Sequence, residues 1–123
     1  MALSKREQRL AFVGLTERDA ALLRALRPVI EQHREALAEA CCRQLETLPE
    51  TNEILHARAG RERLKGFFGQ YLLRITEGNF DDNYFADRQR LGHMHERTGL
   101  QPRWYLLGYG ELFRHLAPLI RQH

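Results

Sequence analysis

The stretch RQRLGHMHERTGLQPRWY, residues 88–105, predicts two helices joined by a short turn. Gly99 is placed to end the first helix in the left-handed conformation, and Pro102 suits the first turn of the second. On the first helix, His93 and His95 point about 200° apart, so they cannot hold one metal ion together. The apolar residues that precede them at helical spacing indicate that His95 is the one that faces inward.

Helix signals extend in both directions from this stretch. Upstream, Asp81 or Asp82 caps the helix that carries His95, and a longer helix before it ends at Gly78-Asn79. Downstream, apolar residues continue at helical spacing until Pro118 disturbs the final turn. The second half of the chain is therefore expected to form three helices with short connections.

The beginning of the chain predicts a short helix and then a long one. Residues 4–12 form a short amphipathic segment, which we expect to pack as an arm. Thr16 and Asp19 then resemble a capping box, in which a hydroxyl accepts a backbone N–H and an acidic side chain lies three residues on. A helix is expected to start at this position.

Proline and glycine residues in the middle of the chain indicate where helices break and where they pack closely. The helix that starts at Thr16 is expected to break at Arg27-Pro28, because the residue before a proline avoids the α region, and a new helix runs from Pro28 to Pro49. Residues 50–60 are expected to hold a short helix and a loop. Gly66 and Gly69 lie inside the following helix at a cost of roughly 1 kcal/mol each relative to alanine, so a neighbour is expected to approach its backbone closely.

Composition indicates one soluble all-α domain. The 123 residues are 43% hydrophobic and 28% charged, which is close to the average for globular proteins. No segment alternates between apolar and polar residues for long enough to predict a strand. No apolar run approaches the ~20 residues that cross a bilayer, and no signal peptide is recognisable, so we expect a cytoplasmic protein without membrane contact.

Charge and cysteine usage exclude several functional classes. Of the 19 basic residues only Lys5 and Lys65 are lysines, and the arginines alternate with acidic residues at helical spacing, which is typical of a solvated face. The basic residues do not cluster on one helix face, so the sequence does not predict nucleic-acid binding. Cys41 and Cys42 are adjacent and expected to stay reduced, and neither has a histidine at helical contact spacing, so nothing indicates an enzyme.

A family resemblance covers almost the whole chain. Residues 88–105 resemble the haem-proximal segment of globin-coupled sensors, whose pattern is R-x-x-I-G-x-x-H-x-R-I-G-L-x-P-x-W-Y. Leu91 and Thr98 replace the two isoleucines of this pattern. The remaining fixed positions match, and they are Arg88, Gly92, His95, Arg97, Gly99, Leu100, Pro102, Trp104 and Tyr105. The stretch VGLT at residues 13–16 and the stretch ERLK at residues 62–65 are similar to the family's first core helix and distal helix.

The resemblance implies a haem-binding sensor globin over residues 16–123, preceded by an N-terminal arm or short helix over residues 1–15. His95 would be the proximal iron ligand of haem b, and Tyr105 would tune its surroundings; the residues alone leave open a buried, hydrogen-bonded histidine and an ordinary aromatic core residue. The remaining expected pocket residues share an apolar or aromatic character apart from one thiol, and they are Cys42, Leu64, Phe67, Phe68, Tyr71, Leu72, Leu91 and Trp104.

The distal side departs from the family pattern. Many relatives carry Phe-Tyr where this chain has Cys41-Cys42, so no tyrosine hydroxyl would hydrogen-bond to bound gas there. Because a thiol is a weak donor, we expect faster loss of O₂, quicker autoxidation, or a preference for CO and NO. As an alternative, a protein side chain could become the sixth ligand, with His56 the nearest candidate in sequence.

The C-terminus departs as well. The family continues into another long helix, whereas this chain stops at His123, so the resemblance implies a C-terminally shortened globin. We expect the residues that would then lack cover to favour a homodimer, and they are Leu106, Phe113, Leu116 and Ile120. The expected function is sensing of O₂, CO or NO for a downstream signalling module; the alternative is a haem-free helical dimerisation module that keeps the globin framework.

Overall fold

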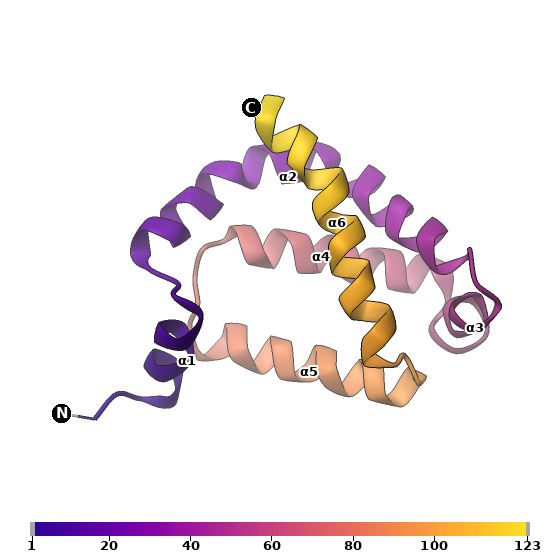
Figure 1. Ribbon diagram of the computed structural model, residues 1–123, viewed down its shortest axis with the longest axis horizontal. Coiled ribbons are helices and arrows are strands. Elements are labelled where there is room, and N and C mark those ends of the chain that lie inside the picture. Colours follow the sequence, from indigo (N-terminus) through magenta and orange to yellow (C-terminus); the bar gives the residue numbers. More distant parts are fainter. Residues whose placement is uncertain (1, 123) are drawn as a thin grey trace.

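The chain is helical along nearly its whole length in a computed structural model that describes residues 2–122 (Figure 1). No strand occurs among these residues, which confirms the all-α prediction. In chain order the helices are α1 (Lys5–Val13), α2 (Glu17–Leu45), α3 (Pro49–Glu53), the π-helix η1 (Ile54–Ala59), α4 (Arg61–Thr76), α5 (Asp82–Thr98) and α6 (Pro102–Gln122).

The long helix α2 begins as predicted but does not break where expected. Thr16 and Asp19 form the capping box, with the Asp19 carboxylate accepting the Thr16 backbone N–H at 2.9 Å. The predicted break at Pro28 is wrong, because α2 continues through it and is only bent (Figure 1). Pro28 is exposed, while Val29 and Ile30 directly after it are buried. Their burial offsets the one helical hydrogen bond that proline removes.

The other helix boundaries follow their local signals. Asp81 caps α5 by accepting the Tyr84 backbone N–H at 2.9 Å, and Gly78 and Gly99 adopt the left-handed conformation after α4 and α5. The predicted disturbance at Pro118 does not end α6, which runs through it to Gln122. Residues 49–59 are helical throughout as α3 and η1, without the loop that was expected there.

The core lies where α2 crosses α4. Ile30 and Leu37 of α2 pack with Leu72 of α4, and α6 lies across these two helices (Figure 1). Gly69 permits the close approach, since a Cβ atom there would lie 3.3 Å from the Arg34 side chain. The expected close neighbour is wrong for Gly66, where nothing lies within 4 Å. The two glycines therefore have different roles.

A network of ion pairs joins α2 to the start of α4. The Arg61 guanidinium binds Glu39 at 2.6 Å and Glu46 at 3.0 Å. Lys65 binds Glu35 at 2.6 Å and Glu39 at 3.1 Å. The Arg61 and Lys65 side chains lower the pKa of Glu39 to about 2, so this carboxylate stays ionised far into the acid range.

Helices α5 and α6 are much less buried than α2 and α4. Neither contains a buried residue. The expected exposure on α6 is confirmed for Leu106, Phe113 and Ile120, which are 61%, 69% and 42% exposed, while Leu116 is half-buried. This half of the molecule presents apolar side chains that the described chain does not cover.

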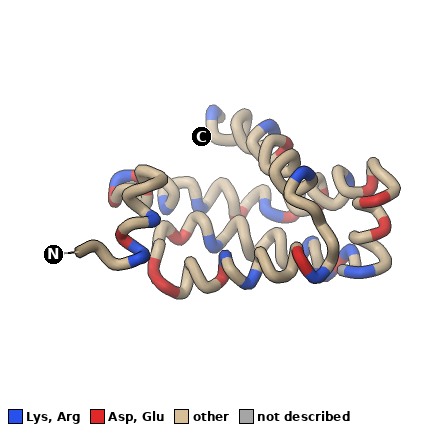
Figure 2. The backbone as a smooth tube through the Cα atoms, turned by 60° about the horizontal axis from the view of Figure 1, so that its bottom comes forward, with Lys and Arg blue, Asp and Glu red and all other residues tan. Residues whose placement is uncertain are grey.

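Two sequence expectations about the surface can be compared with the fold. Basic and acidic residues alternate along the helices without forming a continuous basic block (Figure 2). Among residues 2–122 no helix is both long and apolar enough to cross a membrane.

Candidate functional site

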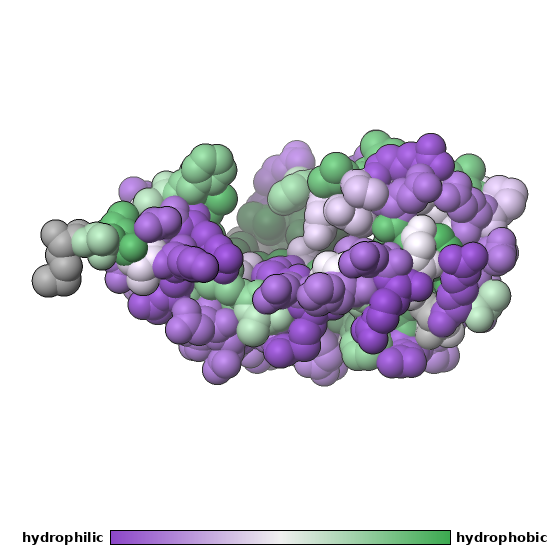
Figure 3. Space-filling view, turned by 90° about the horizontal axis from the view of Figure 1, so that it is seen from below, coloured by the Kyte–Doolittle hydropathy of each residue, from purple (hydrophilic) through white to green (hydrophobic). Residues whose placement is uncertain are grey.

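A large open cleft lies between α4 and α5, two antiparallel helices that are joined by a short turn (Figure 1). Its volume is about 790 Å³, which lies in the range of cofactor sites. Seen from below, the molecule has a mainly hydrophilic outer surface, with a separate hollow beside the N-terminal segment that holds hydrophobic residues (Figure 3); no residue of that segment lines the cleft. The apolar and aromatic residues that line the cleft are Leu64, Phe67, Tyr71, Leu73, Leu91 and Met94.

His95 of α5 is not among the residues that line this cleft, and its ring packs against Tyr105 of α6 instead. It is half-buried, whereas His93 is exposed, which agrees with the expected orientation of the two rings. Leu91, one turn before His95, and Met94 beside it both line the cleft. Burial lowers the pKa of His95, so its imidazole is neutral at pH 7 and can offer a nitrogen lone pair to a metal.

Three tyrosines from two helices surround the space beside His95. The Tyr105 ring of α6 stacks on the His95 ring with 4.6 Å between centroids, and Tyr109 meets Tyr105 edge-on at 6.5 Å. Burial, together with the phenol of Tyr71 on α4, raises the pKa of Tyr109 to about 12. Tyr109 appeared in the sequence only as part of an apolar stripe, and its place in this cluster depends on how α6 crosses the other helices.

Arginine side chains surround the cleft. The Arg88 guanidinium of α5 lies over the Tyr71 ring at 4.2 Å and over the Tyr84 ring at 4.9 Å, so it contacts two aromatic rings. The other arginines that line the cleft are Arg27, Arg58, Arg63, Arg74, Arg90 and Arg97. The site thus combines apolar walls with several guanidinium groups, an arrangement suited to a ligand with an apolar body and an anionic edge.

The two cysteines do not face the cleft. Cys42 is buried with its Sγ 4.0 Å from the Arg61 carbonyl oxygen, beside the start of α4. Cys41 lines a separate small pocket. Burial raises the pKa of both thiols, that of Cys41 to about 12, so both stay protonated at neutral pH.

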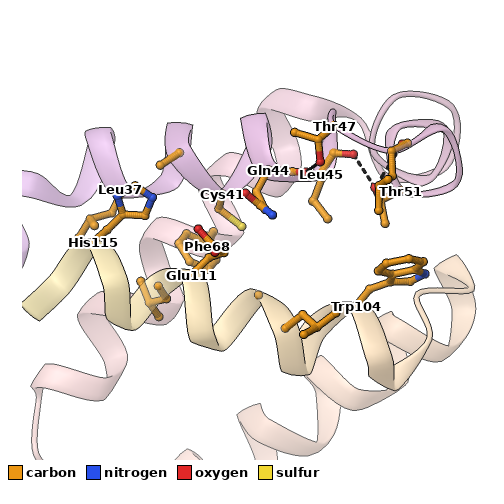
Figure 4. Close-up of a pocket in the computed structure, with 15 residues that line it drawn as sticks. Leu37, Cys41, Gln44, Leu45, Thr47, Thr51, Phe68, Trp104, Glu111 and His115 are labelled. Carbon is orange, nitrogen blue, oxygen red and sulfur yellow. Dashed lines mark hydrogen bonds between the residues drawn. The ribbon is translucent and has the colours of Figure 1, made fainter.

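The small pocket lies between α2 and α6 and has a volume of about 150 Å³. Phe68 and Cys41 lie near its centre, with His115 and Trp104 at opposite ends (Figure 4). The Trp104 indole N–H is buried, and it has no hydrogen-bond partner among the described residues. Leu107 and Leu112 of α6 and Leu37 of α2 add to its largely apolar wall.

The structure divides the residues that the sequence predicts for the site. Leu64, Phe67, Tyr71 and Leu91 line the large cleft, while Phe68 and Trp104 line the small pocket. Leu72 belongs to the core between α2 and α4, and His95 and Tyr105 form a stacked pair beside the cleft. Cys42 lines neither the cleft nor the small pocket.

His56, the alternative sixth ligand, is engaged elsewhere. Its exposed ring lies 2.9 Å from the carboxylate of Glu46, the residue that follows α2, and it does not line the cleft.

Comparison with known proteins agrees with this geometry. The chain is 33% identical over 102 residues to a heme-based aerotactic transducer, HemAT, of Halobacterium salinarum; the match spans 82% of this chain and 21% of that protein. In structure it is similar to the globin domain of a Geobacter sulfurreducens globin-coupled sensor, with a TM-score of 0.88 and 26% identity over 99% of this chain and 80% of that domain. The match to the Protoglobin family extends over residues 3–123. The resemblance to globin-coupled sensors is therefore confirmed, and this chain belongs to the Protoglobin family.

Proposed function

We propose that this chain binds haem b in the cleft between α4 and α5, with His95 as the proximal iron ligand, and senses a diatomic gas without catalysing a reaction. The observation that carries the proposal is an open, apolar-walled cleft of about 790 Å³, lined on the α5 side by Leu91 and Met94, which lie one turn before and directly before the half-buried His95. When bound, haem would supply an iron centre able to bind O₂, CO or NO.

The residues of the chain fit such a group. Leu64 and Phe67 of α4 face Leu91 and Met94 of α5 across the cleft, so a flat apolar body would bury these side chains. His95 would hold the iron through a ring nitrogen, and Tyr105, which stacks on its ring, would orient the imidazole. Some of the arginine side chains that line the cleft would bind the haem carboxylates.

Haemin titration tests the cofactor and its ligand together. The purified chain should take up haemin, and the reduced complex should give a Soret band that shifts on adding CO. His95→Ala should bind haemin more weakly and lose the histidine-ligated spectrum, while the matched variant His93→Ala should behave as wild type because His93 is exposed. Indistinguishable haemin uptake by wild type and His95→Ala would contradict the assignment of His95.

We also propose that bound gas receives only weak polar stabilisation. Cys42 is buried against the Arg61 carbonyl, and Leu64 and Phe67 on the α4 side of the cleft donate no hydrogen bond. Of the donors that α4 adds to the cleft, Tyr71 lies against Tyr109 and Gln70 is exposed. O₂ should therefore leave quickly, and the ferrous protein should autoxidise readily. O₂ release as slow as in relatives with a distal tyrosine would contradict this proposal.

Self-association and signal output form the third part of the proposal. Leu106, Leu107 and Phe113 expose apolar area along α6, which favours a homodimer. Phe113→Glu should shift the chain toward monomer in sedimentation velocity, whereas an unchanged oligomeric state would count against this surface. Because the chain spans only 21% of the aerotactic transducer, we propose that its signal passes to a separate module.

The alternative function is a haem-free dimerisation module, and the exposed apolar residues of α6 favour it. The same haemin titration separates the two: a dimer that takes up no haemin would support the alternative.

A further inference from the structure

The two ends of the cleft differ in how their arginines are compensated. At the end where α5 begins, three of the four arginines bind a carboxylate. Arg27 pairs with Glu31 at 2.9 Å, Arg74 pairs with Asp87 at 3.2 Å, and Arg90 pairs with the same Asp87. The fourth, Arg88, packs against the rings of Tyr71 and Tyr84 instead, so it is the one arginine at this end without a carboxylate partner among the described residues.

At the opposite end, where α4 begins and α5 ends, three arginines line the cleft without an acidic partner. No carboxylate lies within 4.0 Å of the guanidinium of Arg58, Arg63 or Arg97 in the part of the chain that the structure describes. Arg58 donates only to the carbonyl of Thr98 at 3.1 Å, and Arg63 lies over the Phe67 ring at 5.4 Å. These three side chains form the uncompensated arginine group.

Two more features make the end of the cleft at the start of α4 more positive than the other end. The first turn of α4 lies at the end with the uncompensated arginine group, and a helix N-terminus carries partial positive charge. Glu77 and Asp87 line the other end, where they would repel an added carboxylate. Arg88 lies among aromatic rings, and we assign it a packing role between α4 and α5.

We propose that Arg58, Arg63 and Arg97 hold the two propionates of haem, so that haem lies in the cleft with its carboxylate edge toward η1. This proposal rests on the proposed function and adds the orientation of the cofactor and the residues that fix it. Guanidinium groups suit the task because each can bind a carboxylate through two parallel hydrogen bonds. The haem edge without carboxylates then lies beside Tyr71 and Leu73.

The experiment compares haemin with haemin dimethyl ester, which keeps the flat ring and the iron but lacks both carboxylates. Affinities for both probes are measured by absorbance titration of wild type, of Arg58→Gln, Arg63→Gln and Arg97→Gln, and of the triple variant. Arg27→Gln and Arg90→Gln are matched controls, since they remove the same charge from the other end of the same cleft. Arg88→Gln is measured as well, because Arg88 also lines the cleft. Thermal unfolding of each apoprotein verifies that the variants fold.

Each single substitution in the uncompensated arginine group should weaken haemin binding by about fivefold, and the triple substitution by on the order of 100-fold. The controls should change haemin affinity by less than about twofold. The ester should bind wild type and the triple variant equally, because the arginines would have no carboxylate to bind. Added salt should narrow the difference between wild type and the triple variant for haemin but not for the ester.

Three results would overturn the proposal. The first is a triple variant that binds haemin as tightly as wild type. The second is a larger loss of haemin affinity in Arg27→Gln, Arg90→Gln or Arg88→Gln than in the variants of the uncompensated arginine group. The third is a triple variant whose affinities for haemin and for the ester fall equally. In each case the proposed function stands, since wild type still binds haemin. Absence of haemin uptake by wild type would overturn the proposed function and this orientation together.

Discussion

The half of the molecule built from α2 and α4 differs sharply from the half built from α5 and α6. In the first half, Ile30, Leu37 and Leu72 are buried, and ion pairs hold α4 to α2. In the second half, no residue of either helix is buried. The α4 wall of the cleft is thus held by a packed core and ion pairs, whereas the α5 wall is packed loosely enough that a ligand would add contacts to it.

This difference has an energetic consequence. Because apolar burial contributes roughly 25 cal/mol per Å² removed from water, a flat apolar ligand between Phe67 and Leu91 would supply contacts that α5 lacks. A ligand that binds only the folded chain also raises its stability. The stability of the α4 wall should therefore depend on the core between α2 and α4, and the stability of the α5 wall on the ligand bound in the cleft.

The largest expected effect comes from removing a core side chain in the first half. Leu72→Ala should destabilise the apoprotein by about 3 kcal/mol, because Leu72 is only 3% exposed and its loss leaves a cavity. Leu91→Ala, at a half-buried position on the cleft wall, should cost less than about 1 kcal/mol. Denaturant unfolding of both variants measures the two losses of stability, and equal losses would contradict the contrast between the two halves.

Two glycines of α4 should give effects of opposite sign. Gly69→Val should destabilise the fold by roughly 2 kcal/mol, because its side chain would meet Arg34 where α2 and α4 approach closely. Gly66→Ala should stabilise it by about 0.5–1 kcal/mol, since nothing lies within 4 Å and alanine favours the helix. Thermal unfolding midpoints report both changes, and a midpoint lowered by Gly66→Ala would show that its surroundings are not open.

The smallest expected effect is a pH-dependent change in stability, which tests the ion pairs of the first half. The pKa of Glu39 falls from its ordinary 4.5 to about 2 on folding, so its ionisation stabilises the fold above about pH 4.5 and progressively less as pH falls toward 2. Glu39→Gln should therefore be less stable than wild type at pH 7, with the gap closing below pH 4.5. A gap that stays constant from pH 7 to pH 3 would show that Glu39 is not stabilised as an anion.

Local signals in the sequence were sufficient for most helix boundaries but not for all of them. Thr16, Asp81 and Gly99 act on neighbouring backbone groups, so each could be predicted without knowing the fold. Pro28 could not, because α2 continues through it only when Val29 and the residue after it are buried against other helices. Tertiary packing overrides a local preference of this size.

The candidate site was predictable to a similar degree. The spacing of apolar residues predicted that His95 rather than His93 faces inward, and His95 is indeed half-buried against Tyr105 while His93 is exposed. The arginines were indistinguishable in sequence, because an ion pair such as Arg74 with Asp87 depends on which helices meet. Cys42 was expected to face the ligand, but its Sγ lies beside the Arg61 carbonyl, a contact that depends on how α4 packs on α2.

The central claim is that the His95 imidazole binds haem iron in the cleft between α4 and α5. Resonance Raman spectroscopy of the reduced, haemin-reconstituted protein tests it most directly, because the iron–histidine stretching band reports that bond alone. The band should be present in wild type and in His93→Gly, absent in His95→Gly, and restored in His95→Gly by added imidazole. A band that survives in His95→Gly without imidazole, or that disappears in His93→Gly, would contradict the account.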